Sequence, residues 1–109
     1  MNYRVVSIPQ FDKDIKRLAK KYPSVKVDLA ALIKHLSENP VIGIPVFKNC
    51  YKIRISISSK GKGKSSGARV ITYVLVQETT VMLLSIYDKS EKENIEDNEI
   101  LDLINSIGF

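Results

Sequence analysis

The stretch CYKIRISISSKGKGKSSGARVITYVL, Cys50 to Leu75, decides how this chain is expected to fold. From Tyr51 to Ser58 it alternates apolar and polar side chains with a period of two, as a strand with one buried face does. A loop of glycine, serine and lysine follows, and a second strand-like run begins at Ala68. The stretch therefore predicts two strands joined by a long basic loop.

One face of the first strand is apolar and the other is basic. The apolar face is formed by Tyr51, Ile53, Ile55 and Ile57. Lys52 and Arg54 lie together on the polar face, roughly 7 Å apart along the strand. Arg69 opens the second strand and is expected on a polar face as well. Replacing Lys52 or Arg69 is therefore expected to leave folding intact.

Positive charge dominates the middle of the chain. No Asp or Glu occurs from Asn39 to Gln77. The seven cations of this window are Lys48, Lys52, Arg54, Lys60, Lys62, Lys64 and Arg69. The whole chain has a net charge of +5, so the rest sums to −2, and the tail from Asp88 onward carries seven acids against two lysines. This distribution favours a polyanionic partner, although lysines that merely keep a hairpin soluble are the alternative.

Length and composition bound the class of protein. A chain of 109 residues with 44% apolar residues is expected to form a single domain with one core. The one cysteine, Cys50, excludes an intramolecular disulfide and a cysteine-rich metal site. No apolar run reaches transmembrane length. We expect a soluble, cytoplasmic protein without metal, cofactor or membrane partner.

The remaining elements follow from periodicity. Helices are expected at residues 10–22 and 24–39, capped at Ser24 and packed as a helical hairpin. The segment PVIGIP at 40–45 is expected to be a turn. Further strands are expected at 3–8, 68–77 and 79–87, and a short final helix, capped at Asp97, within 96–109. The fold class is α+β: a twisted antiparallel sheet of about four strands against the helical hairpin.

Most catalytic chemistries find no support in the sequence. His35 is the only histidine and is expected to be a partly exposed helix residue rather than a ligand. The loop GKGKSSG lacks the order of a Walker loop and joins strand to strand. Cys50 has no candidate base beside it and is expected to be a small packed residue. What remains is the chemistry of clustered cations.

Clustered lysines and arginines suit the cleavage of RNA. RNA supplies its own nucleophile, the 2′-hydroxyl, so a ribonuclease can work without a metal. It needs a base for that hydroxyl, cations for the phosphorane and an acid for the leaving group. Lys52, Arg54, Arg69 and Lys89 could fill these roles, and Tyr87 could stack on a base or donate a proton.

At these residues the sequence resembles a known family. The segments CYKIRIS, KGKGKSSGARVITYV and LLSIYDKSEKENI, with the helix FDKDIKRLAKKY, are similar to the RelE/ParE toxin superfamily of bacterial type II toxin–antitoxin systems, closest to its RelE- and HigB-like branch. The resemblance covers nearly the whole chain. It implies a fold like that of microbial ribonucleases and a ribosome-dependent mRNA endonuclease, an mRNA interferase that acts in the ribosomal A site and is bound by a cognate antitoxin.

The resemblance also implies roles for residues. Lys52 falls on the strand lysine that serves as general base, and Arg54 on the second basic residue, which stabilises the phosphorane. Arg69 matches a phosphate-clamping arginine, and Lys89 the late basic position. The tyrosine of RelE aligns near Ile95, which can neither stack nor donate, so Tyr87 is the candidate substitute.

The longer loop is given a different role. Its lysines, together with one before the first strand, are expected to contact RNA or the ribosome: Lys48, Lys60, Lys62 and Lys64. Two other functions stay open, because one fold serves several in this superfamily. One is a ParE-like inhibitor of DNA gyrase without nuclease activity. The other is an inactive member that only binds its antitoxin.

Overall fold

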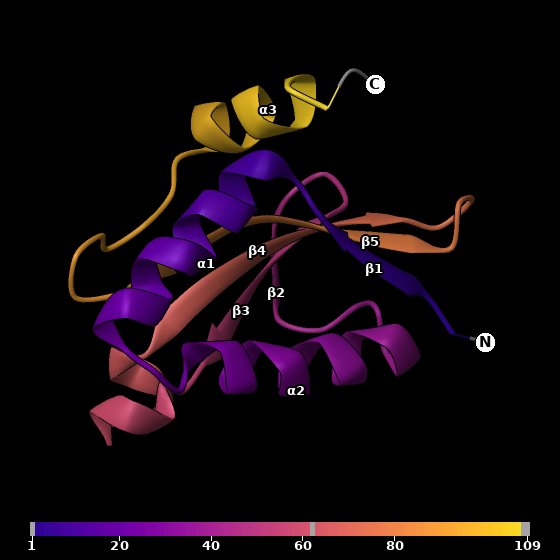
Figure 1. Ribbon diagram of the computed structural model, residues 1–109. Coiled ribbons are helices and arrows are strands. Elements are labelled where there is room, and N and C mark those ends of the chain that lie inside the picture. Colours follow the sequence, from indigo (N-terminus) through magenta and orange to yellow (C-terminus); the bar gives the residue numbers. More distant parts are fainter. Residues whose placement is uncertain (1, 62, 108–109) are drawn as a thin grey trace.

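The computed structural model describes residues 2–61 and 63–107 and contains one mixed sheet with three α-helices (Figure 1). The strands are β1 (Arg4–Ser7), β2 (Ile44–Phe47), β3 (Cys50–Ile55), β4 (Ala68–Leu75) and β5 (Thr80–Asp88). The helices are α1 (Pro9–Lys21), α2 (Val25–Glu38) and α3 (Asp97–Asn105). The predicted α+β class is confirmed.

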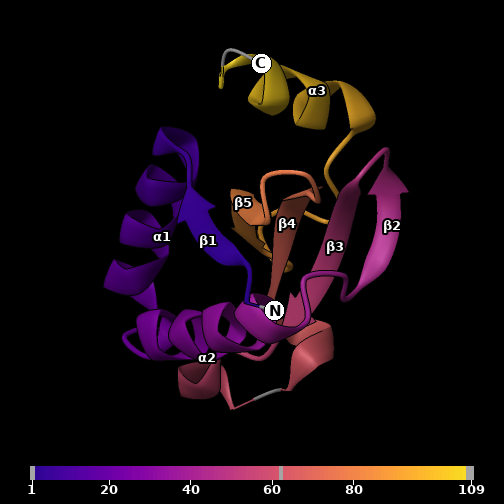
Figure 2. The same cartoon turned by 90° about the vertical axis from the view of Figure 1, so that its right-hand side faces the viewer.

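The sheet has the order β1-β5-β4-β3-β2. Each neighbouring pair among β5, β4, β3 and β2 is antiparallel. β1 pairs parallel with β5 and forms the edge of the sheet opposite β2. In Figure 2, α3 lies above the sheet and α2 lies below it, with α1 beside β1. No helix in the described part of the chain is long and apolar enough to cross a membrane.

The core explains the predicted periodicities. The two N-terminal helices bury one stripe each, which includes Phe11 and Leu18 on α1 and Leu29 and Leu36 on α2. Pro9 begins α1 at a position where its missing N–H costs nothing. β5 is buried along its whole length, because neighbouring strands cover both edges and helices cover both faces.

Two details of the prediction are wrong. Residues 40–45 are not only a turn, because Ile44–Phe47 form the fifth strand, β2, at the sheet edge. Pro45 argued against a strand in the sequence. An edge strand tolerates proline, however, because one side of the strand needs no N–H donor. The cap of α3 is Glu96 rather than Asp97, in a reciprocal capping box with Glu99.

Candidate functional site

A row of cationic side chains crosses the face of the sheet that looks toward α3. Arg54 on β3 lies opposite Arg69 on β4, which in turn lies opposite Tyr87 on β5. Residues in register across a sheet point to the same face, so these three side chains share one face. Lys52 lies on that face two residues along β3. Of the predicted group, which also includes Lys89, the residues Lys52, Arg54, Arg69 and Tyr87 therefore share one face of the sheet.

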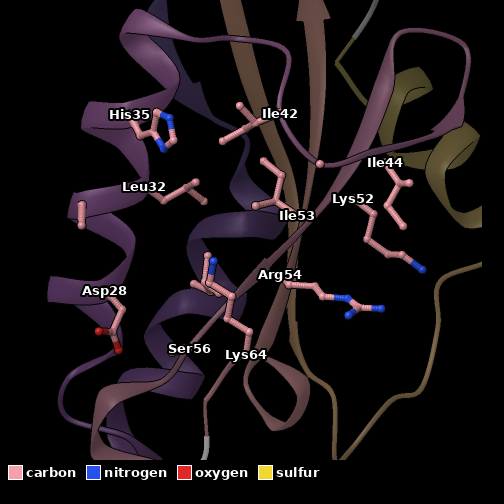
Figure 3. A pocket seen from close by; sticks show the side chains of 13 residues that line it. Asp28, Leu32, His35, Ile42, Ile44, Lys52, Ile53, Arg54, Ser56 and Lys64 are labelled. Atoms are coloured by element: carbon pink, nitrogen blue, oxygen red, sulfur yellow. The ribbon is translucent and has the colours of Figure 1, made fainter.

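Lys52 and Arg54 extend outward from this face. Arg54 is exposed and Lys52 is half-buried. Both side chains point away from α2, whereas Ile53 between them points toward it (Figure 3). The ammonium of Lys52 donates a hydrogen bond to the side-chain oxygen of Asn94, at 3.3 Å. Asn94 belongs to the segment between β5 and α3, and its place beside Lys52 had no counterpart in the sequence prediction.

Arg69 is used differently, although it lies directly opposite Arg54. Its side chain is buried, with 4% of its surface exposed, which corrects the expectation that it lies open on a polar face. The guanidinium donates to the carbonyl oxygens of Lys64 at 2.9 Å and Ser65 at 3.3 Å. Burial, followed by the nearby charge of Arg54, lowers the pKa of Arg69. Arg69 therefore holds the basic loop against β4.

The basic loop is folded and anchored rather than free. It forms two 3₁₀ turns, Ser58–Lys60 and Lys64–Ser66. The Lys60 ammonium reaches inward and forms an ion pair of 2.7 Å with Asp88, whose side chain is fully buried. It also donates to the carbonyl oxygen of Ser66 at 2.8 Å. The expectation that Lys60 offers its charge to RNA is therefore wrong.

Asp88 is the centre of this anchor. Burial disfavours its charge, but hydrogen bonds led by that of Lys60 outweigh burial and hold the pKa of the carboxyl well below its ordinary value. Tyr22, from the end of α1, donates to the same carboxylate at 2.8 Å. The sequence offered one clue to this site: Asp88 is an acid that directly follows the apolar run of β5.

A second anchor fixes the start of the loop to α2. Asp28 accepts hydrogen bonds from the backbone N–H of Ser58 at 2.9 Å and from its hydroxyl. Ser24 was expected to cap α2 through its side chain, but its hydroxyl instead donates to Asp28 at 2.9 Å. The loop is thus tied at both ends, and its position over the sheet is fixed by carboxylates that are distant in sequence.

The other predicted contacts lie in separate segments of the chain. Lys64 is exposed, and so is Lys48, in the turn between β2 and β3. The amine of Lys89 folds back to donate to the carbonyl oxygen of Glu93 at 3.1 Å. Lys62 lies outside the described residues.

Tyr87 faces a cavity rather than the open surface. Its side chain is only 4% exposed, and its hydroxyl has no hydrogen-bond partner in the described part of the chain. A polar cavity of about 410 Å³ lies beside Tyr87, between α1, β5 and α3, and Ile95 also lines it. Burial raises the pKa of the Tyr87 phenol. The phenol therefore keeps its proton at neutral pH.

Two further residues behave as expected from the sequence. Cys50 is fully buried, and burial raises the pKa of its thiol to about 11, as expected for a packed residue. His35 is exposed on α2, beside a groove that runs along β3.

Comparison with known proteins gives the fold a name. No protein-family model matches the chain. A mutant of the Escherichia coli toxin RelE in the free state is similar over 98% of this chain and 99% of its own, with 19% identity and a TM-score of 0.66. The intact E. coli RelBE toxin–antitoxin complex matches over 79% of this chain and 95% of its own, with 23% identity and a TM-score of 0.58.

A complex from another organism extends the likeness. The RelBE2 toxin–antitoxin complex of Mycobacterium tuberculosis matches over 81% of this chain and 92% of its own, with 16% identity and a TM-score of 0.56. Structures with 16–23% identity therefore share the overall fold of this chain. The chain has the fold of the RelE toxins.

Proposed function

We propose that the chain is the toxin of a type II toxin–antitoxin system and cleaves mRNA on the ribosome in the cytoplasm. The observation that carries this proposal is the outward pair Lys52 and Arg54 on β3. These cations have no carboxylate partner among the described residues, whereas Lys60 in the adjoining loop forms an ion pair with Asp88. Free cations in a fold that can pair them suit a bound phosphodiester.

The proposed reaction is attack by the ribose 2′-oxygen on the neighbouring phosphorus. Lys52 is the general base that takes the proton of the 2′-hydroxyl, and Arg54 stabilises the charge that gathers on the phosphorane oxygens. The bond from phosphorus to the 5′-oxygen breaks, which leaves a 2′,3′-cyclic phosphate and a 5′-hydroxyl. Lys89 adds positive charge near this centre.

Tyr87 is the proposed donor of the proton to the 5′-oxygen. Its raised pKa keeps the phenol protonated, and its hydroxyl is not committed to another described residue. The hydroxyl is buried and residues of α3 line the cavity beside Tyr87, so α3 must shift before the leaving group can reach the hydroxyl. Arg69, opposite Arg54 on the neighbouring strand, supports the centre by fixing the loop and by its charge.

The partner of the free toxin is proposed to be an antitoxin encoded beside it. Two of the solved structures that share the fold are toxin–antitoxin complexes. The exposed residues Lys48 and Lys64 are proposed to contact ribosomal RNA.

The test is cleavage of mRNA during translation. Purified protein is added to a translation reaction, and new 5′ ends are mapped by primer extension with and without ribosomes. We expect discrete cuts within translated codons that vanish without ribosomes and fall by orders of magnitude in Lys52→Ala, with an unchanged melting temperature. Intact mRNA would overturn the nuclease proposal, and a DNA supercoiling assay would then test inhibition of gyrase.

A further inference from the structure

The ammonium of Lys52 has one hydrogen-bond partner in the described part of the chain, and that partner carries no charge. It donates to the side-chain oxygen of Asn94 at 3.3 Å, and it takes part in no ion pair there. Lys60 and Lys92, by contrast, each pair with a carboxylate. The amide oxygen of Asn94 holds the amine in place without a negative charge beside it.

The backbone on both sides of Asn94 is fixed. This residue lies in the connection from β5 to α3. The carbonyl oxygen of Glu93, just before it, accepts a hydrogen bond from the amine of Lys89 at 3.1 Å. Ile95, just after it, is buried with 6% of its surface exposed. Asn94 therefore has little freedom to move away from Lys52.

Among the described residues, no other group competes for the amine of Lys52. Its neighbours across the sheet are the apolar residues Ile44 and Ile71. The titratable side chains that line the groove beside it are those of Asp28, His35, Arg54 and Lys64. Asp28, the only acid of that set, accepts hydrogen bonds from Ser58. No ion pair joins Lys52 to the acids of α3, which are Asp97, Glu99 and Asp102.

A neutral anchor suits a lysine that acts as a general base. The lysine stem has four carbons and many rotamers, so an unanchored amine spends little time in any one place. A carboxylate anchor would favour the charged ammonium, which cannot accept a proton. An amine ready to accept a proton still carries two N–H groups, so it can donate one to Asn94 while its lone pair faces the 2′-hydroxyl.

We propose that Asn94 is a positioning residue, which holds the amine of Lys52 in the direction from which it takes the proton of the 2′-hydroxyl. Asn94 acts through Lys52 and not through contact with RNA. The gain comes from the fixed geometry of the base, to which proton transfer is sensitive. This inference rests on the nuclease part of the proposed function and adds to it a residue outside the sheet.

A double-mutant cycle tests whether Asn94 acts through Lys52. Cleavage is measured on ribosomes that hold a short mRNA, with the protein in excess and the new 5′ ends mapped by primer extension. Asn94→Ala should slow cleavage by about tenfold. The same change in the Lys52→Ala background should alter the rate by less than about twofold. Equal factors in the two backgrounds would overturn the inference, because Asn94 would then act independently of Lys52.

Two substitutions at the same position separate positioning from a merely structural contact. Asn94→Gln keeps the amide oxygen and should retain the rate within about threefold. Asn94→Asp also keeps an acceptor, but its charge favours the ammonium form of Lys52 and should slow cleavage by about tenfold. A contact that only ties the segment to β3 would be strengthened by this carboxylate, so undiminished cleavage in Asn94→Asp would overturn the inference.

Controls exclude other effects of the new charge. In the Lys52→Ala background, Asn94→Asp should change the rate by less than about twofold, whereas repulsion between the carboxylate and RNA would persist there and contradict the inference. Asn39→Asp makes the same chemical change at an exposed residue that ends α2 and should leave cleavage within about twofold of the wild type.

The same assay separates this inference from the nuclease proposal. Asn94 is exposed, so the melting temperature of each Asn94 variant should stay within about 3 °C of the wild type. Cleavage by the wild type together with an undiminished rate in Asn94→Ala would overturn this inference alone. Intact mRNA with the wild type would overturn the nuclease proposal, and the positioning role with it.

Discussion

β3 and the loop that follows it carry the same kinds of side chain and use them in opposite ways. Lys52 and Arg54 on β3 extend outward without a carboxylate in the described chain, whereas Lys60 in the loop is buried against Asp88. Arg54 and Arg69 even lie opposite each other in register, yet one is exposed and the other holds loop carbonyls. The contrast shows that the inward cations, Lys60 and Arg69, stabilise the loop and the sheet, whereas the outward cations of β3 stay available to a ligand.

The largest expected effect separates the two arginines. Arg54→Ala should lower the rate of mRNA cleavage by about a hundredfold to a thousandfold, because it removes charge from the phosphorane. Its free energy of unfolding should change by less than about 0.5 kcal/mol, since the side chain is exposed. Cleavage is measured by primer extension and stability by urea denaturation.

Arg69→Ala is the matched comparison for that measurement. It should lower the free energy of unfolding by about 1–3 kcal/mol, because the loop carbonyls lose their donor. The contrast between the regions breaks down if Arg69→Ala is as stable as the wild type, or if Arg54→Ala unfolds the chain.

The second effect is on stability and compares two loop lysines. Lys60→Met keeps the length of the side chain but leaves the Asp88 carboxylate buried without its ion pair. Such a loss costs about 3 kcal/mol. Lys64→Met, at an exposed position of the same loop, should cost less than about 0.5 kcal/mol. Equal costs in urea denaturation would show that Lys60 is not an anchor.

The third effect is the pH dependence of the stability that Asp88 contributes. The folded protein holds the pKa of Asp88 below its ordinary value, so the carboxylate contributes stability above about pH 4 that is lost as the pH falls further. Asp88→Asn lacks this contribution. The difference in free energy of unfolding between wild type and variant should be about 2 kcal/mol at pH 7 and shrink steadily below pH 4.

A double variant checks the cause of that pH dependence. Combining Lys60→Met with Asp88→Asn removes both charges, so no uncompensated charge remains buried. The double variant should be more stable than Lys60→Met alone, because the penalty of the single change comes from the unpaired carboxylate. If the double variant instead lost as much free energy of unfolding as the two single variants together, the anchor would stabilise the protein through side-chain packing rather than through the ion pair.

The sequence predicts one of the two regions well and the other poorly, for a physical reason. The alternation of apolar and polar residues along 51–57 predicts which face of the sheet each side chain points to, so the outward direction of Lys52 and Arg54 was predictable from the sequence. Alternation does not state what covers a face. Lys60 and Asp88 are 28 residues apart, and only the folded chain brings them together.

The same reason explains the other differences. Arg69 alternates onto the same face as Arg54 but lies under the loop that it holds, so its burial is a property of loop folding. β2 was missed because Gly43 and Pro45 resemble a turn, while the edge of a finished sheet accepts both. Strands and helices with a clear period were predictable, and the contacts between distant carboxylates and the loop were not.

The smallest expected effect concerns the exposed remainder of the loop. Anchoring by Lys60 and Arg69 leaves Lys64 as the described loop lysine whose side chain is free to meet ribosomal RNA. Lys64→Ala should reduce the slope of log affinity for ribosomes against log salt by about 0.7–0.9, the share of one phosphate contact. Lys34→Ala, an exposed lysine of α2 on the other side of the sheet, is the control and should leave that slope unchanged. Equal slopes in wild type and Lys64→Ala would mean that Lys64 makes no phosphate contact on the ribosome and that the described part of the loop serves only as an anchor.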